Sequence, residues 1–180
     1  MTYEAFINNF KSHIIALSYK ERLSLAISVC EKLFVDYQDF YEENNWGDPG
    51  VLLEAIKLCR LSQTDNVEEI HLKEALVKFD RITPDTEDFS NASYALNACV
   101  AICGTLEFIM DKEAMHVFNV GVCLTDTIDV GVREEGDLTE EQIDEHPMMI
   151  EAREFLLGDY TNKNKVAGIF KRLKQLFRHK

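Results

Sequence analysis

Hydrophobic positions along the chain recur with a helical period over most of its length. Residues 3–17 place Phe6, Phe10 and Ile14 on one stripe, which is the spacing of an amphipathic helix with one buried face. The same pattern predicts further helices over residues 19–43, 49–62, 67–81, 89–110, 112–133, 147–157 and 164–178. We therefore expect an all-α fold, a compact bundle of seven to nine helices in which residues 1–180 form a single domain.

Capping residues mark several of the expected helix starts. Ser18 with Glu21, and Thr139 with Gln142, have the spacing of a capping box, in which each side chain accepts a hydrogen bond from the other's backbone N–H. Other candidate helix starts are Asp48 followed by Pro49, Asn66, and Pro147.

Two segments are informative because of their composition. Residues 89–110 are rich in Ala, Leu, Ile and Cys and carry few charges, which predicts a central helix that is buried on most sides. Residues 120–132 contain many β-branched side chains, so a strand is an alternative there. Val120, Leu124 and Ile128 keep a helical period, and this favours a helix.

Charge is distributed unevenly. The net charge is −13, but residues 161–180 hold seven Lys and Arg and no acid, so residues 1–160 combine 12 bases with 32 acids for a net charge of −20. A body this acidic repels nucleic acid and anionic membranes and attracts basic proteins. No uncharged apolar run is long enough to span a membrane, and the N-terminus lacks the basic region of a signal peptide. We expect a soluble, cytoplasmic protein with no direct nucleic-acid or membrane partner.

The C-terminal segment has the reverse charge. Residues 164–178 are predicted to form a basic amphipathic helix with an apolar stripe. Because this stripe must be covered and the body is acidic, we favour docking on the chain's own domain. The stripe consists of Val166, Ile169, Phe170, Leu173, Leu176 and Phe177, and the opposite side carries Lys171, Arg172, Lys174 and Arg178.

The five cysteines are predicted to be buried, reduced thiols, because each has apolar neighbours and their number is odd. Cys99 and Cys103 share a helix face, but a zinc site needs four ligands and no second pair is present, so core packing is the better interpretation. No metal or other cofactor is expected. The cysteines are Cys30, Cys59, Cys99, Cys103 and Cys123.

Catalytic signals are weak. Asp126 and Asp129 lie three residues apart and would share a helix face, and Glu113 with His116 forms a single Glu-x-x-His pair. These four residues could build an enzyme site only if the fold brought them together. The five histidines lie in no recognisable nucleophile motif. We therefore expect a protein that is not an enzyme.

One segment stands out as a docking surface for a basic protein. Residues 134–145 hold seven acids in twelve positions and lack the ligand pattern of an EF-hand. A solvated loop is the alternative. Trp46, Tyr41 or Phe89 could supply an apolar anchor for the partner. The acids predicted to bind the partner are Glu134, Glu135, Asp137, Glu140, Glu141, Asp144 and Glu145.

Several short sequence motifs between residues 20 and 160 resemble those of a known family. They are Cys30-Glu31-Lys32-Leu33-Phe34, Trp46-Gly47-Asp48, Lys78-Phe79-Asp80, Pro84, Asp88-Phe89, Ala98-Cys99-Val100-Ala101, Leu138-Thr139-Glu140-Glu141 and His146-Pro147. Together they look like the YjaG-like family of bacterial proteins, a family of unknown function. The resemblance implies an all-helical fold in the bacterial cytoplasm and supplies no catalytic residue. The chain differs from that family at its end, where a basic helix replaces a longer acidic tail.

These observations lead to one functional expectation and two alternatives. The acidic body and the missing catalytic signature favour an immunity protein that neutralises a basic toxin, such as a nuclease domain. A housekeeping YjaG-like protein is the first alternative, and a helical-bundle enzyme is the second.

Overall fold

The computed structural model describes residues 1–158, and these residues form eight α-helices and no strand. The all-α prediction is confirmed, and the segment over 120–132 is helical. The predicted helix over 164–178 lies outside the described residues. The helices are α1 (Tyr3–Ala16), α2 (Tyr19–Asn44), α3 (Pro49–Leu61), α4 (Glu69–Phe79), α5 (Ala92–Asp111), α6 (Ala114–Arg133), α7 (Glu140–Asp144) and α8 (Pro147–Leu157).

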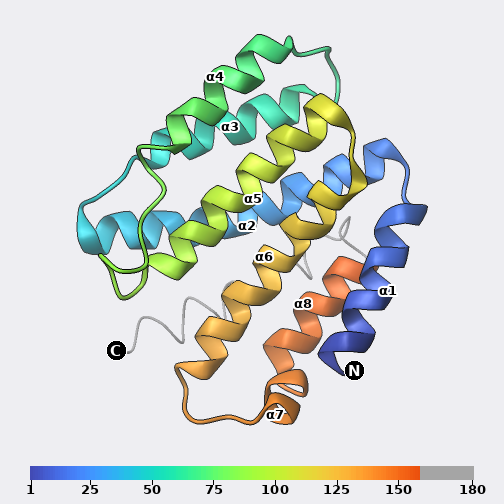
Figure 1. The fold of residues 1–180 in the computed structure, drawn as a ribbon, viewed down its shortest axis with the longest axis vertical. Coiled ribbons are helices and arrows are strands. Elements are labelled where there is room, and N and C mark those ends of the chain that lie inside the picture. Colours follow the sequence, from blue (N-terminus) through green and yellow to red (C-terminus); the bar gives the residue numbers. More distant parts are fainter. Residues whose placement is uncertain (159–180) are drawn as a thin grey trace.

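Three long helices form the centre of the molecule. Helix α5 packs against α2 on one side and runs antiparallel to α6 on the other (Figure 1). The α3–α4 pair covers one edge of this centre, and α3 contacts α2 while both helices contact α5. On the other edge α1 and α8 lie side by side against α6, and the short helix α7 joins the ends of α6 and α8.

One cluster of buried apolar side chains extends from α1 to α8. As predicted, α5 is the central helix, with Ala95, Ala98 and Ile102 fully buried, although Val100 is 46% exposed. Helix α5 is also long and apolar enough to span a membrane by length and composition alone. In this fold it is surrounded by four other helices, an arrangement typical of a core helix.

Local capping rules explain most helix starts. Ser18 and Glu21 form both hydrogen bonds of a capping box, and so do Thr139 and Gln142. The Asp48 side chain caps α3, in which Pro49 is the first residue, as predicted. The expected cap at Asn66 is wrong. Helix α4 starts later, at Glu69, because residues 62–65 continue as turns whose N–H groups bond to carbonyls of residues 58–61.

The packing of α1 on α6 depends on a glycine. A Cβ atom at Gly121 would lie 2.3 Å from the ring of Phe10 and 3.2 Å from Leu156. Only a residue without a side chain lets the aromatic pair of Phe6 and Phe10, whose centroids are 5.4 Å apart, press onto α6. This contact places the start of α1 beside α6 and α8.

Candidate functional site

Four carboxylates and two arginines meet where the start of α1, the end of α6, α7 and α8 come together. They line a pocket of about 180 Å³, which we call the acidic corner. The fold therefore unites two features that are separate in sequence, the pair on α6 and the acidic segment after it. The lining residues are Tyr3, Thr125, Asp126, Asp129, Arg133, Glu140, Ile143, Asp144, Met149 and Arg153.

Arg133 connects the two acidic elements. Its Nε donates to Asp129 Oδ2 at 2.8 Å, one helical turn earlier on α6, and its Nη2 donates to Glu140 Oε1 at 2.7 Å. The hydrogen bonds to these two carboxylates raise the pKa of Arg133 above its ordinary value. The capping box of Thr139 starts α7 and so places Glu140 at the pocket. Asp129 and Glu140 are thus held by a cation of the chain itself.

Asp126 differs from its neighbours. Its side chain is exposed at the pocket, and within residues 1–158 it forms no ion pair or hydrogen bond. Desolvation raises the pKa of this carboxyl group, and the nearby charge of Asp129 raises it further. A carboxylate in this position gains from an approaching cation, because a positive charge offsets both effects.

Six of the seven acids predicted to bind a partner are exposed: Glu134, Glu135, Asp137, Glu140, Glu141 and Glu145. The seventh, Asp144, is 17% exposed at its side chain, and its Oδ1 accepts from Arg153 at 2.7 Å. Asp144 is therefore a structural residue in this fold. Within the described part of the chain, Asp137, Glu141 and Glu145 form no ion pair.

Trp46 lies in another part of the fold, at the corner between α2 and α3. Its ring packs against Phe40 and Phe89, with centroids 6.1 Å and 5.5 Å away. Neither of these aromatic partners lines the acidic corner. Trp46 is partly buried in this aromatic cluster, so its packing already accounts for its presence.

The four residues of the alternative enzyme site fall into two places. His116 lies in a pocket between α5 and α6, where its Nε2 is 2.8 Å from Asp111 and its Nδ1 is 3.3 Å from Glu107. Asp126 follows ten residues later on the same helix, which corresponds to about 15 Å along the axis. Glu113 precedes α6 at the same end as His116. Within residues 1–158 no group of three or more metal-ligating side chains is placed to hold an ion.

The thiols lie in apolar surroundings. Cys30, Cys59, Cys99 and Cys123 are buried, and Cys103 is partly buried. Burial raises the pKa of Cys59 and of Cys103 to about 12, so neither is a thiolate near neutral pH. All five cysteines are free. Their environment is that of core residues and not of reactive nucleophiles.

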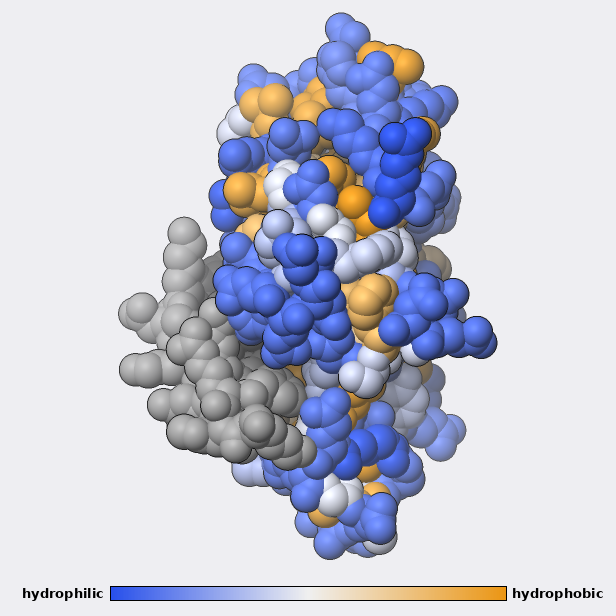
Figure 2. Space-filling model, turned by 90° about the vertical axis from the view of Figure 1, so that its left-hand side faces the viewer, coloured by the Kyte–Doolittle hydropathy of each residue, from blue (hydrophilic) through white to orange (hydrophobic). Residues whose placement is uncertain are grey.

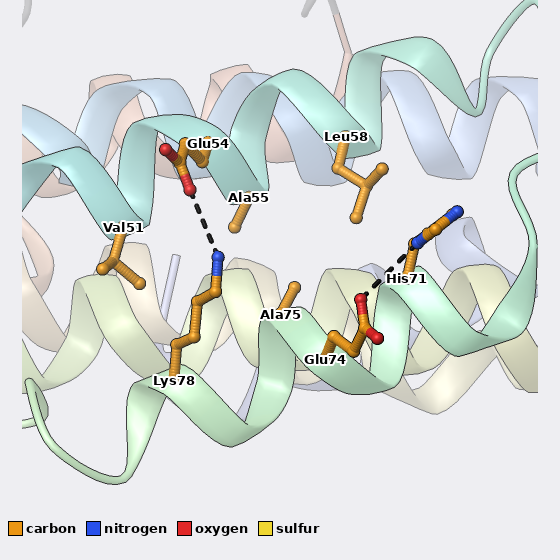
Figure 3. Close-up of a pocket in the computed structure, with 8 residues that line it drawn as sticks. All are labelled: Val51, Glu54, Ala55, Leu58, His71, Glu74, Ala75 and Lys78. Atoms are coloured by element: carbon orange, nitrogen blue, oxygen red, sulfur yellow. Dashed lines mark hydrogen bonds and ion pairs between the residues drawn. The ribbon is translucent and has the colours of Figure 1, made fainter.

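A second groove runs between α3 and α4 and has a volume of about 280 Å³ (Figure 3). Ala55 and Ala75 face one another in its middle. Lys78 on α4 reaches across to Glu54 on α3, with 3.3 Å between Nζ and Oε2. The groove is thus bridged by an ion pair within the chain. Lys78 and Glu54 neutralise one another, whereas Asp126 in the acidic corner forms no ion pair within residues 1–158.

The surface in Figure 2 is mainly hydrophilic, and its apolar residues form separate small patches. Where this face is not covered by the residues drawn in grey, it lacks the broad apolar area typical of an obligate protein interface. Binding through this face would rely on polar and charged groups.

Fold and surface together define an all-α helical bundle with an acidic corner. The sequence profile of the family described as "Protein of unknown function (DUF416)" matches residues 9–179. The chain belongs to the DUF416 family. The resemblance noted from the sequence is thereby confirmed in its coarser form, a family of unknown function. The match includes the basic C-terminal segment, which we had expected to depart from the family pattern.

A solved structure of a DUF416 family protein from Shewanella baltica OS155 has a similar fold, with a TM-score of 0.73. The two sequences are 24% identical, and the similarity covers 94% of this chain and 92% of that chain. This likeness shows the fold alone. No curated protein matches the chain.

Sequence reasoning missed the two arginines of the acidic corner. Arg133 had a detectable signal, because it follows Asp129 by four residues on the same helix. Arg153 had none, since its partners are Met1 and Asp144, and only the tertiary fold brings them together.

Proposed function

We propose that this chain is an acidic protein-binding module whose acidic corner docks a basic protein. The observation that supports this proposal is the position of Asp126, an exposed carboxylate that forms no ion pair within residues 1–158, while Arg133 and Arg153 of the same pocket pair with its other carboxylates. A lysine or arginine side chain of a partner would supply the missing charge. The exposed acids of the segment after α6 flank the pocket and steer such a partner towards it.

The partner that we propose is a nuclease-type bacterial toxin, and the chain would be its immunity protein. A nuclease cleft is cationic because it binds phosphates, so an acidic surface can occupy the same cleft. The net charge of −20 over residues 1–160 adds long-range attraction to the local contacts.

The family match over residues 9–179 favours a second candidate, a housekeeping role shared within the family or its YjaG-like members. The neighbouring genes separate the two candidates. A toxin-domain gene directly beside this one is expected for an immunity protein. A conserved unrelated neighbourhood without toxin genes is expected for a housekeeping role.

The proposal is tested by association kinetics with the adjacent toxin-domain protein, prepared as an inactive variant. The triple variant Asp137→Lys, Glu141→Lys, Glu145→Lys reverses three exposed acids beside the pocket. Its association should be slower by about tenfold or more at low salt, because the steering field is lost. The difference should shrink between about 0.1 M and about 1 M salt, where the Debye length falls from about 10 Å to about 3 Å.

A matched control carries the same change in net charge elsewhere. Glu42, Glu87 and Asp88 are exposed and form no ion pair within the described residues, so reversing them to Lys changes the total charge equally. If both triple variants slow association to the same extent, only net charge matters and the acidic corner is not the docking site. Asp126→Asn should instead accelerate dissociation, because it removes a direct contact.

A further inference from the structure

A pocket of about 590 Å³ lies on another part of the molecule, between the start of α2, the α3–α4 connection and the end of α5. Its volume is in the range of about 300–1,000 Å³ that is usual for small-molecule sites. The lining residues are Tyr19, Lys20, Leu23, Ser24, Ser62, Gln63, Thr64, Asp65, Asn66, Val67, Ile109 and Lys112.

Two lysines at this pocket have no anionic partner in the described part of the chain. Neither Lys20 nor Lys112 forms an ion pair or a side-chain hydrogen bond there, although acids outnumber bases 32 to 12 in residues 1–160. Some other cations of the domain, such as Arg60 and Lys73, pair with a carboxylate at 2.7 Å and 2.6 Å, whereas the exposed Lys57 forms no ion pair among the described residues either. The one acid that lines the pocket, Asp65, accepts a hydrogen bond from the hydroxyl group of Thr64 at 3.0 Å.

Lys112 is unusual for its backbone. It ends α5 with φ at 66°, a left-handed conformation that glycine and asparagine adopt more readily. The only other non-glycine residue with positive φ in residues 1–158 is Asn45, which ends α2. A cation is favoured at the negative end of the helix dipole, which partly accounts for a lysine at this position. The same position places the Lys112 side chain at the pocket.

The remaining walls provide apolar contact and hydrogen-bonding groups. The Tyr19 ring stacks on Phe108 with 5.2 Å between centroids, and Leu23 is buried beside it. The Gln63 amide donates to Ser24 Oγ at 3.1 Å, which joins the α3–α4 connection to α2 at one wall of the pocket. Asn66, which does not cap α4, also lines the pocket.

We propose that this pocket binds a small organic anion, with Lys20 and Lys112 pairing with its carboxylate or phosphate group and Tyr19 contacting its apolar part. The helix N-terminus of α2 is not the anion site, because Glu21 already occupies its capping box. Charge-assisted hydrogen bonds from two lysines would outweigh the repulsion from the acidic body, which solvent screens over distance. This site is independent of the acidic corner.

The test uses isothermal titration and amide NMR shifts with three probes of one size class. Benzoate and phenyl phosphate carry an anionic group, and benzyl alcohol is the neutral control. Both anions, or the better of the two, should bind with a Kd of about 1 mM or lower and shift amides of residues 19–24, 62–67 and 109–112. The stronger anion identifies the headgroup. Equal binding of benzyl alcohol, or no shift with either anion, would overturn the proposal.

Substitutions test whether Lys20 and Lys112 bind the anion. Lys20→Gln and Lys112→Asn should each weaken anion binding by about tenfold, whereas Lys57→Gln, an exposed lysine on α3 that does not line the pocket, should have no effect. Asn at position 112 tolerates the left-handed backbone, so the melting temperature of Lys112→Asn should not fall. Equal affinity of all three variants would contradict the assignment, as would a loss of binding that merely follows a loss of folding.

Discussion

The guanidinium group of Arg153 and the carboxylate of Asp144 form a partly buried ion pair, with 2.7 Å between Nη2 and Oδ1. The same two side chains fasten the N-terminus. Arg153 Nη1 donates to the carbonyl oxygen of Met1 at 2.7 Å, and Asp144 Oδ2 accepts from the backbone N–H of Tyr3 at 3.2 Å. The Arg153 side chain is 4% exposed, so this pair is shielded from water.

Asp144→Asn is expected to destabilise the domain strongly. The substitution leaves the Arg153 charge buried without its counter-ion, which typically costs about 3–5 kcal/mol. Urea unfolding would measure the loss, and hydrogen exchange should show faster opening at the start of α1. The double variant Asp144→Asn, Arg153→Met should be more stable than Asp144→Asn alone, because no unpaired charge remains. If Asp137→Asn, at an exposed site, is equally harmful, the pair has no special role.

The hydroxyl group of Tyr37 is expected to hold the corner between α2 and α3. It donates to the carbonyl oxygen of Ile82 at 2.7 Å and accepts from the backbone N–H of Asp48 at 3.2 Å. Tyr37→Phe should cost about 1–3 kcal/mol, because the buried Ile82 carbonyl and the partly buried Asp48 N–H lose this partner. Thermal unfolding would detect this change. Tyr41→Phe, at an exposed site, is the control and should have little effect.

A substitution at Gly47 tests the same corner, because Gly47 lies against the Tyr37 hydroxyl group. Its φ is +95°, and a Cβ atom there would lie 2.2 Å from the Tyr37 hydroxyl oxygen. Gly47→Ala should therefore destabilise the domain by about 2 kcal/mol or more, from backbone strain and from the clash. Adding Tyr37→Phe removes the clashing atom, so the two losses should be less than additive in a double-mutant cycle. Simple additivity would show that the clash is relieved by other movements.

Sequence patterns predicted the helices well because most of their determinants are local. Both capping boxes form as expected, since each needs only two side chains three residues apart. Asn66 shows the limit of this reasoning. An asparagine before an apolar period is a good cap only if the chain enters the helix there, and the turns after α3 delay α4 to Glu69.

The candidate sites were less predictable, because they combine residues from distant parts of the chain. The acidic segment was visible as a local cluster, but Asp144 could be assigned to the structure only after Arg153 appeared beside it. The pocket around Lys20 and Lys112 had no sequence signal at all, since 92 positions separate the two lysines. Side-chain convergence of this kind is a property of the tertiary packing.

Stability at alkaline pH should be governed by the buried thiols. Burial raises the pKa of Cys59, Cys99 and Cys123 from 9.0 to about 12, and Cys103 behaves likewise. Between pH 9 and 12 the unfolded chain therefore loses thiol protons that the native chain keeps. Each such thiol lowers the free energy of unfolding by about 1.4 kcal/mol per pH unit in that range. Below pH 9 their contribution is fully present.

Lys32 should act in the opposite direction at slightly lower pH. Its pKa falls from 10.5 to about 8, mainly through desolvation, and the charges of Glu151 and Glu31 offset part of this effect. Between pH 8 and 10.5 the unfolded chain keeps a proton that the native chain releases, so stability rises with pH. Below pH 9 the effect of Lys32 on the free energy of unfolding is larger than that of the thiols, and above pH 9 the combined effect of the thiols is larger. We therefore expect maximal stability near pH 9. Urea unfolding from pH 7 to 10.5, with a reducing agent present, would locate the maximum. In Cys59→Ala the free energy of unfolding should fall less steeply above pH 9, by the contribution of one thiol. In Lys32→Met it should rise less steeply below pH 9. A decline that is unchanged by Cys59→Ala would show that other groups determine the alkaline limit.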